Sequence, residues 1–227
     1  MCGRIFYKYS LKELRIYFPD LQIPFSQEQF PANYNLAPAA AIPVIHQSHH
    51  GLALNFFTWG LIPSWSKNVP TKPLFNARTE TIYEKPSFRD SYRYRRCIVP
   101  VSGFFEWKAL AKEKKPYVVT YQKPKIMFLA GIWDHWMHAN GSEVLSVSVL
   151  TTGANALLQE IHHRMPVLLA EKDFSDWWKS PQTADSLLVP APIQGMHKYR
   201  SNPIVNRSTS NSPACIAEDS EMSLFPE

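Results

Sequence analysis

The amino-acid sequence predicts an α+β protein rich in β-strands, and three features of its composition indicate this class. The 227 residues can bury a substantial core in one large domain or two small ones. Hydrophobic residues make up 45% of the chain and aromatic residues 13%, as is typical of a globular protein. The 19 prolines against 8 glycines favour defined turns and strand ends over long uninterrupted helices. We therefore expect β-strands joined by a few short helices.

Regular structure is expected over much of the chain. Ser10 and Glu13 have the spacing of a capping box, and the apolar residues that follow predict a short helix that Pro19 ends. The expected elements are, in order, a strand over 4–9, this helix over 10–18, a hairpin of 42–45 with 52–57, strands over 97–101, 116–121, 125–133 and 144–150, a helix over 152–161, a strand over 166–169 and a helix over 171–178.

The remaining segments are expected to be irregular. Residues 33–38 are rich in turn formers, residues 59–65 are too broken for a helix, and residues 109–115 read as a charged hairpin loop. The chain becomes irregular from about Pro181, and its last fifteen residues are expected to fray. We expect one domain over residues 1–210 and a flexible acidic tail over residues 211–227.

The charge and the cysteines limit the classes of function. A formal net charge of +5 is consistent with a polyanionic partner such as nucleic acid. Cys2, Cys97 and Cys215 are too few and too widely spaced for a disulfide framework or a zinc cluster, which favours a reducing compartment. No apolar run resembles a signal peptide or a membrane span, so we expect a cytoplasmic protein. No cofactor or metal is expected, because His135 and His138 have no carboxylate or cysteine at useful spacing.

The start of the chain, Met1-Cys2-Gly3-Arg4, carries the most specific chemistry. If Met1 is removed, Cys2 offers an amine and a thiol on adjacent carbons, which together can close a thiazolidine ring on an aldehyde. An α-amino group with a pKa of about 7.7–8.0 is partly neutral near pH 7.5, whereas a lysine amine is almost fully protonated. The alternative is that Met-Cys is merely how this chain begins.

Other side chains are open to two interpretations from the residues alone. Glu106 lies between aromatic residues, where a carboxyl pKa tends to rise and suit proton transfer, or it is an edge glutamate paired with Lys108. Trp59 and Trp65 either pack at an edge of the core or stack on bases, where stacking contributes about 1–3 kcal/mol of binding free energy per base.

Two polar segments have the same ambiguity. Residues 75–81 are polar at every second position, which places Asn76, Arg78 and Glu80 on one face of an extended chain. Residues 89–96 interleave basic and aromatic groups, either as a solvated approach to a strand or as a phosphate-binding edge.

A series of short motifs, in order along residues 2–207, resembles the SOS response-associated peptidase (SRAP) family. The motifs are Met1-Cys2-Gly3-Arg4, Asn35-Leu36-Ala37-Pro38, Trp59-Gly60, Asn76-Ala77-Arg78-Thr79-Glu80-Thr81, Gly103-Phe104-Phe105-Glu106-Trp107, Ala130-Gly131-Ile132-Trp133 and His162-His163-Arg164-Met165-Pro166. The resemblance implies a single α+β domain with a barrel-like, mainly antiparallel β core. It also implies covalent capture of abasic sites in single-stranded DNA by the mature N-terminal cysteine, which shields the lesion. After His197 the usual family spacing is not held.

The resemblance assigns roles to four residues. Cys2 would be the nucleophile, its amine attacking C1′ of the ring-opened sugar and its thiol completing the thiazolidine. Asn76 would bond to the N-terminal residue and the sugar, Glu106 would orient the amine and assist proton transfer, and His162 would act as acid or base on the sugar oxygen. The small residue after Met1 is compatible with methionine removal by the host aminopeptidase.

The resemblance also suggests partners. Arg4 and Arg78 match DNA-contacting positions and would clamp phosphates. Trp59 and Trp65 are candidates for base stacking, and Arg95 and Arg96 for attraction of the DNA backbone. In the tail, Glu221, Met222, Ser223, Leu224 and Phe225 resemble a degenerate form of the peptide by which bacterial proteins dock on the sliding clamp. Nothing in the sequence requires more than a monomer.

Two other classes of function stay open at this stage. The protein could be an N-terminal-nucleophile cysteine peptidase that uses its own amine as base. It could instead be a non-covalent single-stranded DNA-binding module, with salt-reversible binding that is indifferent to the lesion. A strand-cleaving lyase activity is a side reaction that would compete with ring closure.

Overall fold

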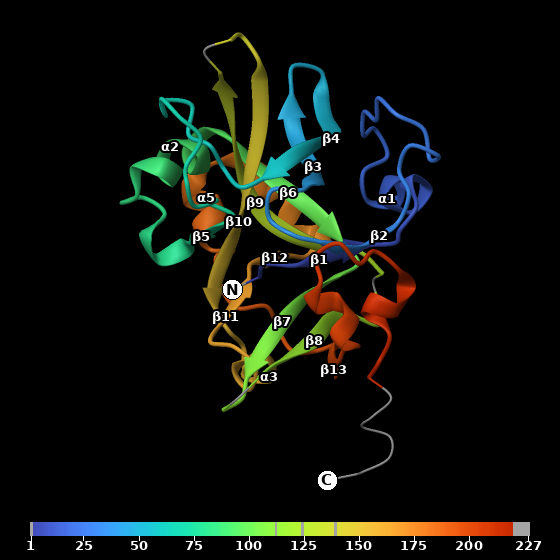
Figure 1. Ribbon diagram of the computed structural model, residues 1–227. Helices are drawn as coiled ribbons and strands as arrows, with labels where there is room; N and C mark the ends of the chain where they lie inside the picture. Colours follow the sequence, from blue (N-terminus) through green and yellow to red (C-terminus); the bar gives the residue numbers. More distant parts are fainter. Residues whose placement is uncertain (1, 112, 124, 139, 220–227) are drawn as a thin grey trace.

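The computed structural model describes residues 2–111, 113–123, 125–138 and 140–219 (Figure 1). The strands are β1 (Ile5–Tyr7), β2 (Asn33–Leu36), β3 (Ala41–Ser48), β4 (Gly51–Trp59), β5 (Asn76–Arg78), β6 (Arg96–Val101), β7 (Gly103–Ala109), β8 (Lys114–Tyr121), β9 (Met127–Met137), β10 (Glu143–Gly153), β11 (Arg164–Pro166), β12 (Leu168–Leu169) and β13 (Met196–Arg200). The helices are α1 (Leu11–Tyr17), α2 (Pro86–Tyr94), α3 (Ala156–Gln159), α4 (Phe174–Lys179) and α5 (Pro181–Asp185), with 3-10 turns η1 (Thr79–Thr81), η2 (Glu171–Asp173), η3 (Pro203–Asn206) and η4 (Pro213–Ile216).

The centre of the molecule is a closed barrel. Strands β10, β4, β3, β6 and β9 follow one another around it, and β9 closes the ring by pairing with both β6 and β10. The pairs are antiparallel apart from β10–β4, which is parallel. Apolar side chains of these strands, such as Ile45, Val99 and Val147, are fully buried. The predicted α+β class with a barrel-like, mainly antiparallel core is confirmed.

A second sheet, in the order β13-β8-β7-β1-β2, packs beside the barrel and lies below it in Figure 1. Strand β6 of the barrel passes through Ser102 directly into β7 of this sheet. Gly103 is required at the start of β7, because a Cβ there would lie 2.6 Å from the Phe6 ring and from the Val119 carbonyl oxygen. Barrel and sheet therefore meet in a tight junction around β1 and β7.

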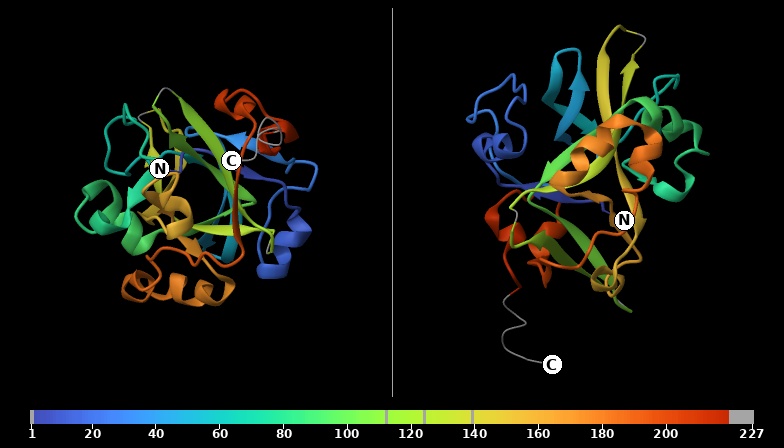
Figure 2. Two further views of the ribbon diagram at one scale, coloured as in Figure 1. Left: turned by 90° about the horizontal axis from the view of Figure 1, so that it is seen from below. Right: turned by 180° about the vertical axis from the view of Figure 1, so that it is seen from behind.

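Helices cover the outside of the barrel. Viewed from behind in Figure 2, α4 and α5 lie between α1 and α2. The indole of Trp177 on α4 donates to the carbonyl of Cys97 on β6 (3.1 Å), and Phe174 stacks on Phe18 beside α1 at 4.8 Å. Within the described part of the chain, no helix has both the length and the apolar character needed to cross a bilayer.

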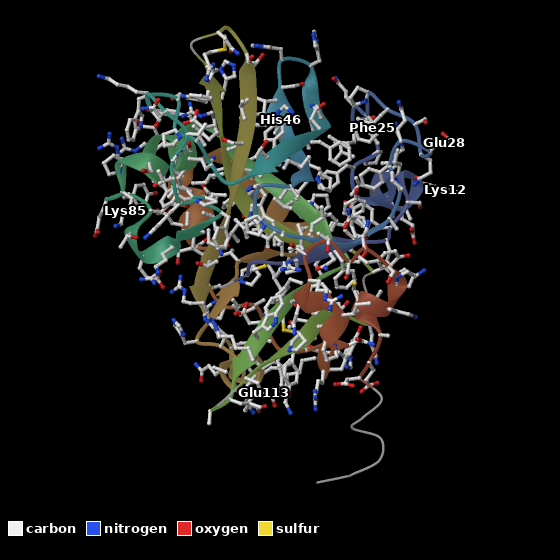
Figure 3. The ribbon with its side chains drawn as sticks, viewed as in Figure 1. Lys12, Phe25, Glu28, His46, Lys85 and Glu113 are labelled. Atoms are coloured by element: carbon white, nitrogen blue, oxygen red, sulfur yellow. The ribbon has the colours of Figure 1, made fainter. Side chains whose placement is uncertain are left out.

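Several predicted elements are confirmed. Ser10 and Glu13 form the expected capping box at the start of α1. The β3–β4 hairpin is present, although its strands extend to Ser48 and from Gly51, so its turn is shorter than expected. The charged loop joins β7 to β8 and is shorter than expected, because Ala109 pairs with Lys114. Glu113, directly before β8, lies at this end of the hairpin (Figure 3).

Other predictions were wrong. Residues 33–36, expected to be irregular, form β2 because they pair with β1. Residues 86–94, for which no helix was predicted, form helix α2, because Pro86 occupies its first turn and Phe88 and Tyr92 bury one face. The helix expected over 152–161 is confined to α3, because β10 continues to Gly153 and Asn155 caps the helix. The segment from Pro181 onward, expected to be irregular, contains α5 and β13.

The part of the expected tail that the structure describes, residues 211–219, contacts the preceding chain. Cys215 of η4 is buried, the Ser201 hydroxyl donates to the Cys215 carbonyl oxygen (2.7 Å), and Asp219 forms an ion pair with Arg200 (2.9 Å). Residues 211–219 therefore pack against the domain. The proposed clamp-binding segment, Glu221, Met222, Ser223, Leu224 and Phe225, lies outside the described residues.

Candidate active site

Cys2 lies three residues before β1, near the junction of barrel and second sheet. Its side chain is fully buried at 0% exposure, and its carbonyl oxygen accepts a hydrogen bond from Asn76 Nδ2 at 2.8 Å. Burial raises the pKa of the Cys2 thiol well above its usual range, and the nearby charge of Glu106 raises it further. The thiol is therefore protonated at neutral pH.

Asn76 reaches Cys2 from β5, which pairs in parallel with β10 of the barrel. The extended backbone turns Ala77 into the core and leaves Arg78 exposed. Among the described residues, Asn76 Oδ1 is buried without a hydrogen-bond partner. An amide held on one side by Cys2 thus keeps an acceptor available for a donor that enters the site.

Glu106 reaches the same place from β7 and is only 5% exposed. Its Oε1 lies 3.7 Å from His162 Nδ1. Burial raises the pKa of the Glu106 carboxyl, as the aromatic neighbours in the sequence indicated. A carboxylate with a raised pKa is a stronger base than an exposed one.

His162 follows α3 and completes the group. Its Nδ1 accepts a hydrogen bond from the backbone N–H of Arg164 at 3.0 Å, which places the ring proton on Nε2. Burial lowers the pKa of His162, so the ring is neutral near pH 7. His163, which had no expected role, stacks on His162 with ring centroids 4.3 Å apart.

Arg164 is a residue at the site that the sequence reasoning missed. Its guanidinium is buried and bonds both carboxylate oxygens of Glu80, as well as the Thr151 carbonyl oxygen on β10. This ion pair ties η1, directly after β5, to β10 and β11. The sequence did offer one indication of this role, because Arg164 directly follows His162 and His163 in the same motif.

The candidate DNA contacts divide into exposed and internal groups. Arg78 is exposed beside Asn76, and Trp65 is 61% exposed. Trp59, by contrast, is fully buried, and its indole N–H donates to the Phe75 carbonyl at 2.9 Å. It belongs to the core, so its proposed stacking on bases is corrected.

The basic residues Arg95, directly before β6, and Arg96, its first residue, also need correction. Arg96 is buried, and its guanidinium donates to the carbonyls of Trp177 (2.8 Å) and Tyr92 (2.9 Å). It therefore bonds the end of α2 and is not available to DNA. Arg95 is partly exposed but forms an ion pair with the buried carboxylate of Asp134 at 3.2 Å. Arg4, the remaining candidate, also makes internal contacts.

The described residues contain no group of three or more histidine, cysteine, aspartate or glutamate side chains that could hold a metal ion. All three cysteines are buried and free of disulfides.

A closed barrel, a side sheet and a cysteine surrounded by an amide, a carboxylate and an imidazole define a single-domain α+β protein with a cysteine-centred polar site. The family model described as SOS response associated peptidase (SRAP) matches residues 1–208, so the chain belongs to this family.

Named relatives extend over nearly the whole chain. The abasic site processing protein YoaM of Bacillus subtilis is 33% identical, over 98% of this chain and 100% of the relative. The abasic site processing protein HMCES of Xenopus tropicalis is 29% identical, over 84% of this chain and 67% of the relative. A crystal structure of a protein from Bacteroides thetaiotaomicron has a TM-score of 0.82 and 28% identity, over 95% of this chain and 99% of that protein.

Proposed function

We propose that this protein processes abasic sites in single-stranded DNA by covalent capture through Cys2, which forms a thiazolidine crosslink that shields the lesion. The observation that carries the proposal is the arrangement of Asn76, Glu106 and His162 around Cys2. The names of the relatives support the choice of substrate. The proposal requires removal of Met1, which exposes the α-amine of Cys2.

The amine reacts first in this scheme. The neutral α-amine attacks C1′ of the ring-opened sugar, and the resulting carbinolamine loses water to give an imine. The thiol then adds to the imine carbon, and its proton passes to the nitrogen as the five-membered ring closes. The balance is one water lost per crosslink. This order suits a buried thiol with a raised pKa, because a protonated thiol cannot compete as the first nucleophile.

Glu106 is the base in this scheme. When the neutral amine attacks the aldehyde, its nitrogen becomes positively charged, and the Glu106 carboxylate removes one of the protons on that nitrogen. The raised pKa of Glu106 makes this transfer easier than for an exposed glutamate. The same group can return the proton when the crosslink reverses.

His162 is the proton donor. With Nδ1 bonded to the Arg164 backbone N–H, the neutral ring presents Nε2–H for donation. We assign this proton to the sugar oxygen during ring opening and to the hydroxyl that leaves as water. Asn76 Oδ1 would accept from the Cys2 amine or a sugar hydroxyl and so satisfy its buried acceptor.

DNA binding rests on Arg78 and Trp65 in this proposal. The exposed guanidinium of Arg78, two residues from Asn76, would pair with a phosphate, a contact without sequence information. The exposed indole of Trp65 offers a stacking face for a base.

Variants at Cys2 test the mechanism. Cys2→Ala removes the thiol and should give no stable crosslink with an oligonucleotide carrying one abasic site. Cys2→Ser can still form an imine, so a product should appear only when borohydride reduces it. Because that imine cannot close a stable thiazolidine ring, strand cleavage by β-elimination should also increase.

Cys215→Ala is the matched control, because Cys215 is a buried free cysteine of the smaller core cluster. It should crosslink like the wild type. A stable crosslink formed by Cys2→Ala would refute the mechanism. Salt-reversible binding without a covalent product would favour a simple DNA-binding module, and turnover of unrelated peptides would favour a peptidase.

A further inference from the structure

Arg4 lies two residues from Cys2, yet its guanidinium bonds groups of the protein itself. We propose that Arg4 is a positioning residue for Cys2, held by Asn35 and the Val205 carbonyl, and is not a phosphate contact. This inference rests on the proposed function of Cys2.

The side chain of Arg4 is held on three sides. Its Nη1 donates to Asn35 Oδ1 at 2.6 Å and to the Val205 carbonyl oxygen at 2.8 Å. Its guanidinium carbon also lies 5.6 Å from the ring centroid of Trp107, within the range of a cation–π contact. Arg78, by contrast, is exposed.

Asn35 connects Arg4 to the C-terminal part of the chain. This buried side chain on β2 donates from Nδ2 to the carbonyls of Val205 (3.3 Å), Arg207 (2.9 Å) and Ser210 (2.7 Å). Arg4 and Asn35 therefore share the Val205 carbonyl. The indole of Trp107 holds the same segment through Asn206 Oδ1 at 2.8 Å.

The main chain of Arg4 transmits this anchoring to the site. Its carbonyl oxygen accepts from the N–H of Phe105 at 2.9 Å, and Phe105 directly precedes Glu106 on β7. The Cys2 sulfur lies 4.0 Å from the same oxygen. A shift at residue 4 therefore moves Cys2 relative to Glu106, and a displacement of about 1 Å can cost about 100-fold in rate.

Arg4→Lys is the sharpest variant, because it keeps the charge but lacks the planar guanidinium that these acceptors fit. If Arg4 only attracts a phosphate, Arg4→Lys should crosslink almost normally. If Arg4 positions Cys2, the rate should fall about 10-fold or more. The fall should appear both with an abasic oligonucleotide and with free 2-deoxyribose, which has no phosphate to bind.

Equilibrium binding separates the two roles further. The affinity of Arg4→Lys for undamaged single-stranded DNA should stay within about 2-fold of the wild type, and Arg4→Gln should leave the slope of log K against log salt unchanged. Arg78→Gln should lower that slope by about 0.7, the value for one phosphate contact on a single strand.

The side chain of Asn35 lies outside the N-terminal segment but holds Arg4. Asn35→Ser should therefore slow the same step as Arg4→Lys. Lys12→Gln is the charge control, because Lys12 is exposed on α1 at the edge of the molecule (Figure 3). All assays are run below the melting temperature of each variant.

A normal crosslinking rate for Arg4→Lys with both substrates would overturn this inference about Arg4 but leave the proposed function standing. So would a slope lowered by Arg4→Gln together with a normal rate of Arg4→Lys on 2-deoxyribose. A wild type that forms no adduct at all would overturn the proposed function as well.

Discussion

At the scale of single residues, burial gives the groups around Cys2 their chemical character. It keeps the thiol protonated, makes Glu106 a better base and holds His162 neutral. In this account the α-amine is the first nucleophile because its ordinary pKa leaves part of it neutral near pH 7.5.

The raised pKa of Glu106 predicts an effect on stability. Below the ordinary glutamate pKa of about 4.3 the carboxyl is protonated in both folded and unfolded chains, and the native state keeps its full stability. As the pH rises through the higher native pKa, a buried charge forms and that stability is lost. Glu106→Gln should therefore melt at a higher temperature than the wild type at pH 7.

This difference should disappear near pH 4, and calorimetry at several pH values checks it. Glu84→Gln, at an exposed position, should not change the melting temperature at either pH. A Glu106→Gln variant less stable than the wild type at pH 7 would show that the carboxylate stabilises the fold. The same variant should slow crosslinking, which would make Glu106 a group kept for function at a cost in stability.

Residue chemistry explains both the success and the errors of sequence reasoning. The motifs led to Cys2, Asn76, Glu106 and His162, which the fold brings together from four separate segments; their catalytic roles stay predictions. Arg96 was misjudged because its partners are the carbonyls that end α2, a helix that was not expected. Without that helix in view, its charge suggested a surface position.

At the scale of elements, the site depends on how β7 enters the second sheet. Gly103→Ala would place a Cβ 2.6 Å from the Val119 carbonyl oxygen and from the Phe6 ring. Because neither the sheet backbone nor a buried ring can move easily, the free energy of unfolding should fall by about 2–3 kcal/mol. Urea denaturation measures this loss.

Gly153→Ala is the matched control at the end of β10, where a Cβ would meet nothing within 4 Å. Its stability should stay within about 0.5 kcal/mol of the wild type. Equal effects of the two substitutions would contradict the tight junction of β6, β7 and β1.

Elements also show where sequence patterns lose their power. The capping box and the β3–β4 hairpin are local, and the sequence predicted both. Strand β2 exists because it pairs with β1, and β13 because it pairs with β8, so their turn-rich or polar sequences could not reveal them.

At the scale of the whole molecule, the barrel and the second sheet act as two supports for one site. The barrel supplies Asn76 through β5 and places His162 before β11, whereas the sheet supplies Glu106 and the start of β1. The C-terminal segment contacts the second sheet near the site, because Arg4 and Asn35 both donate to the Val205 carbonyl oxygen. The resemblance to a family predicted the overall class, but the packing of residues 211–219 depends on long-range contacts that no local pattern shows.

Intact mass spectrometry tests the central claim most directly. The purified protein is measured before and after incubation with a single-stranded oligonucleotide that carries one abasic site, and the adduct is mapped by proteolysis. The account predicts a free protein that lacks Met1, and an adduct that adds the oligonucleotide mass minus one water at Cys2. A protein that lacks Met1 but gains no mass, or an adduct at any other residue, would contradict it.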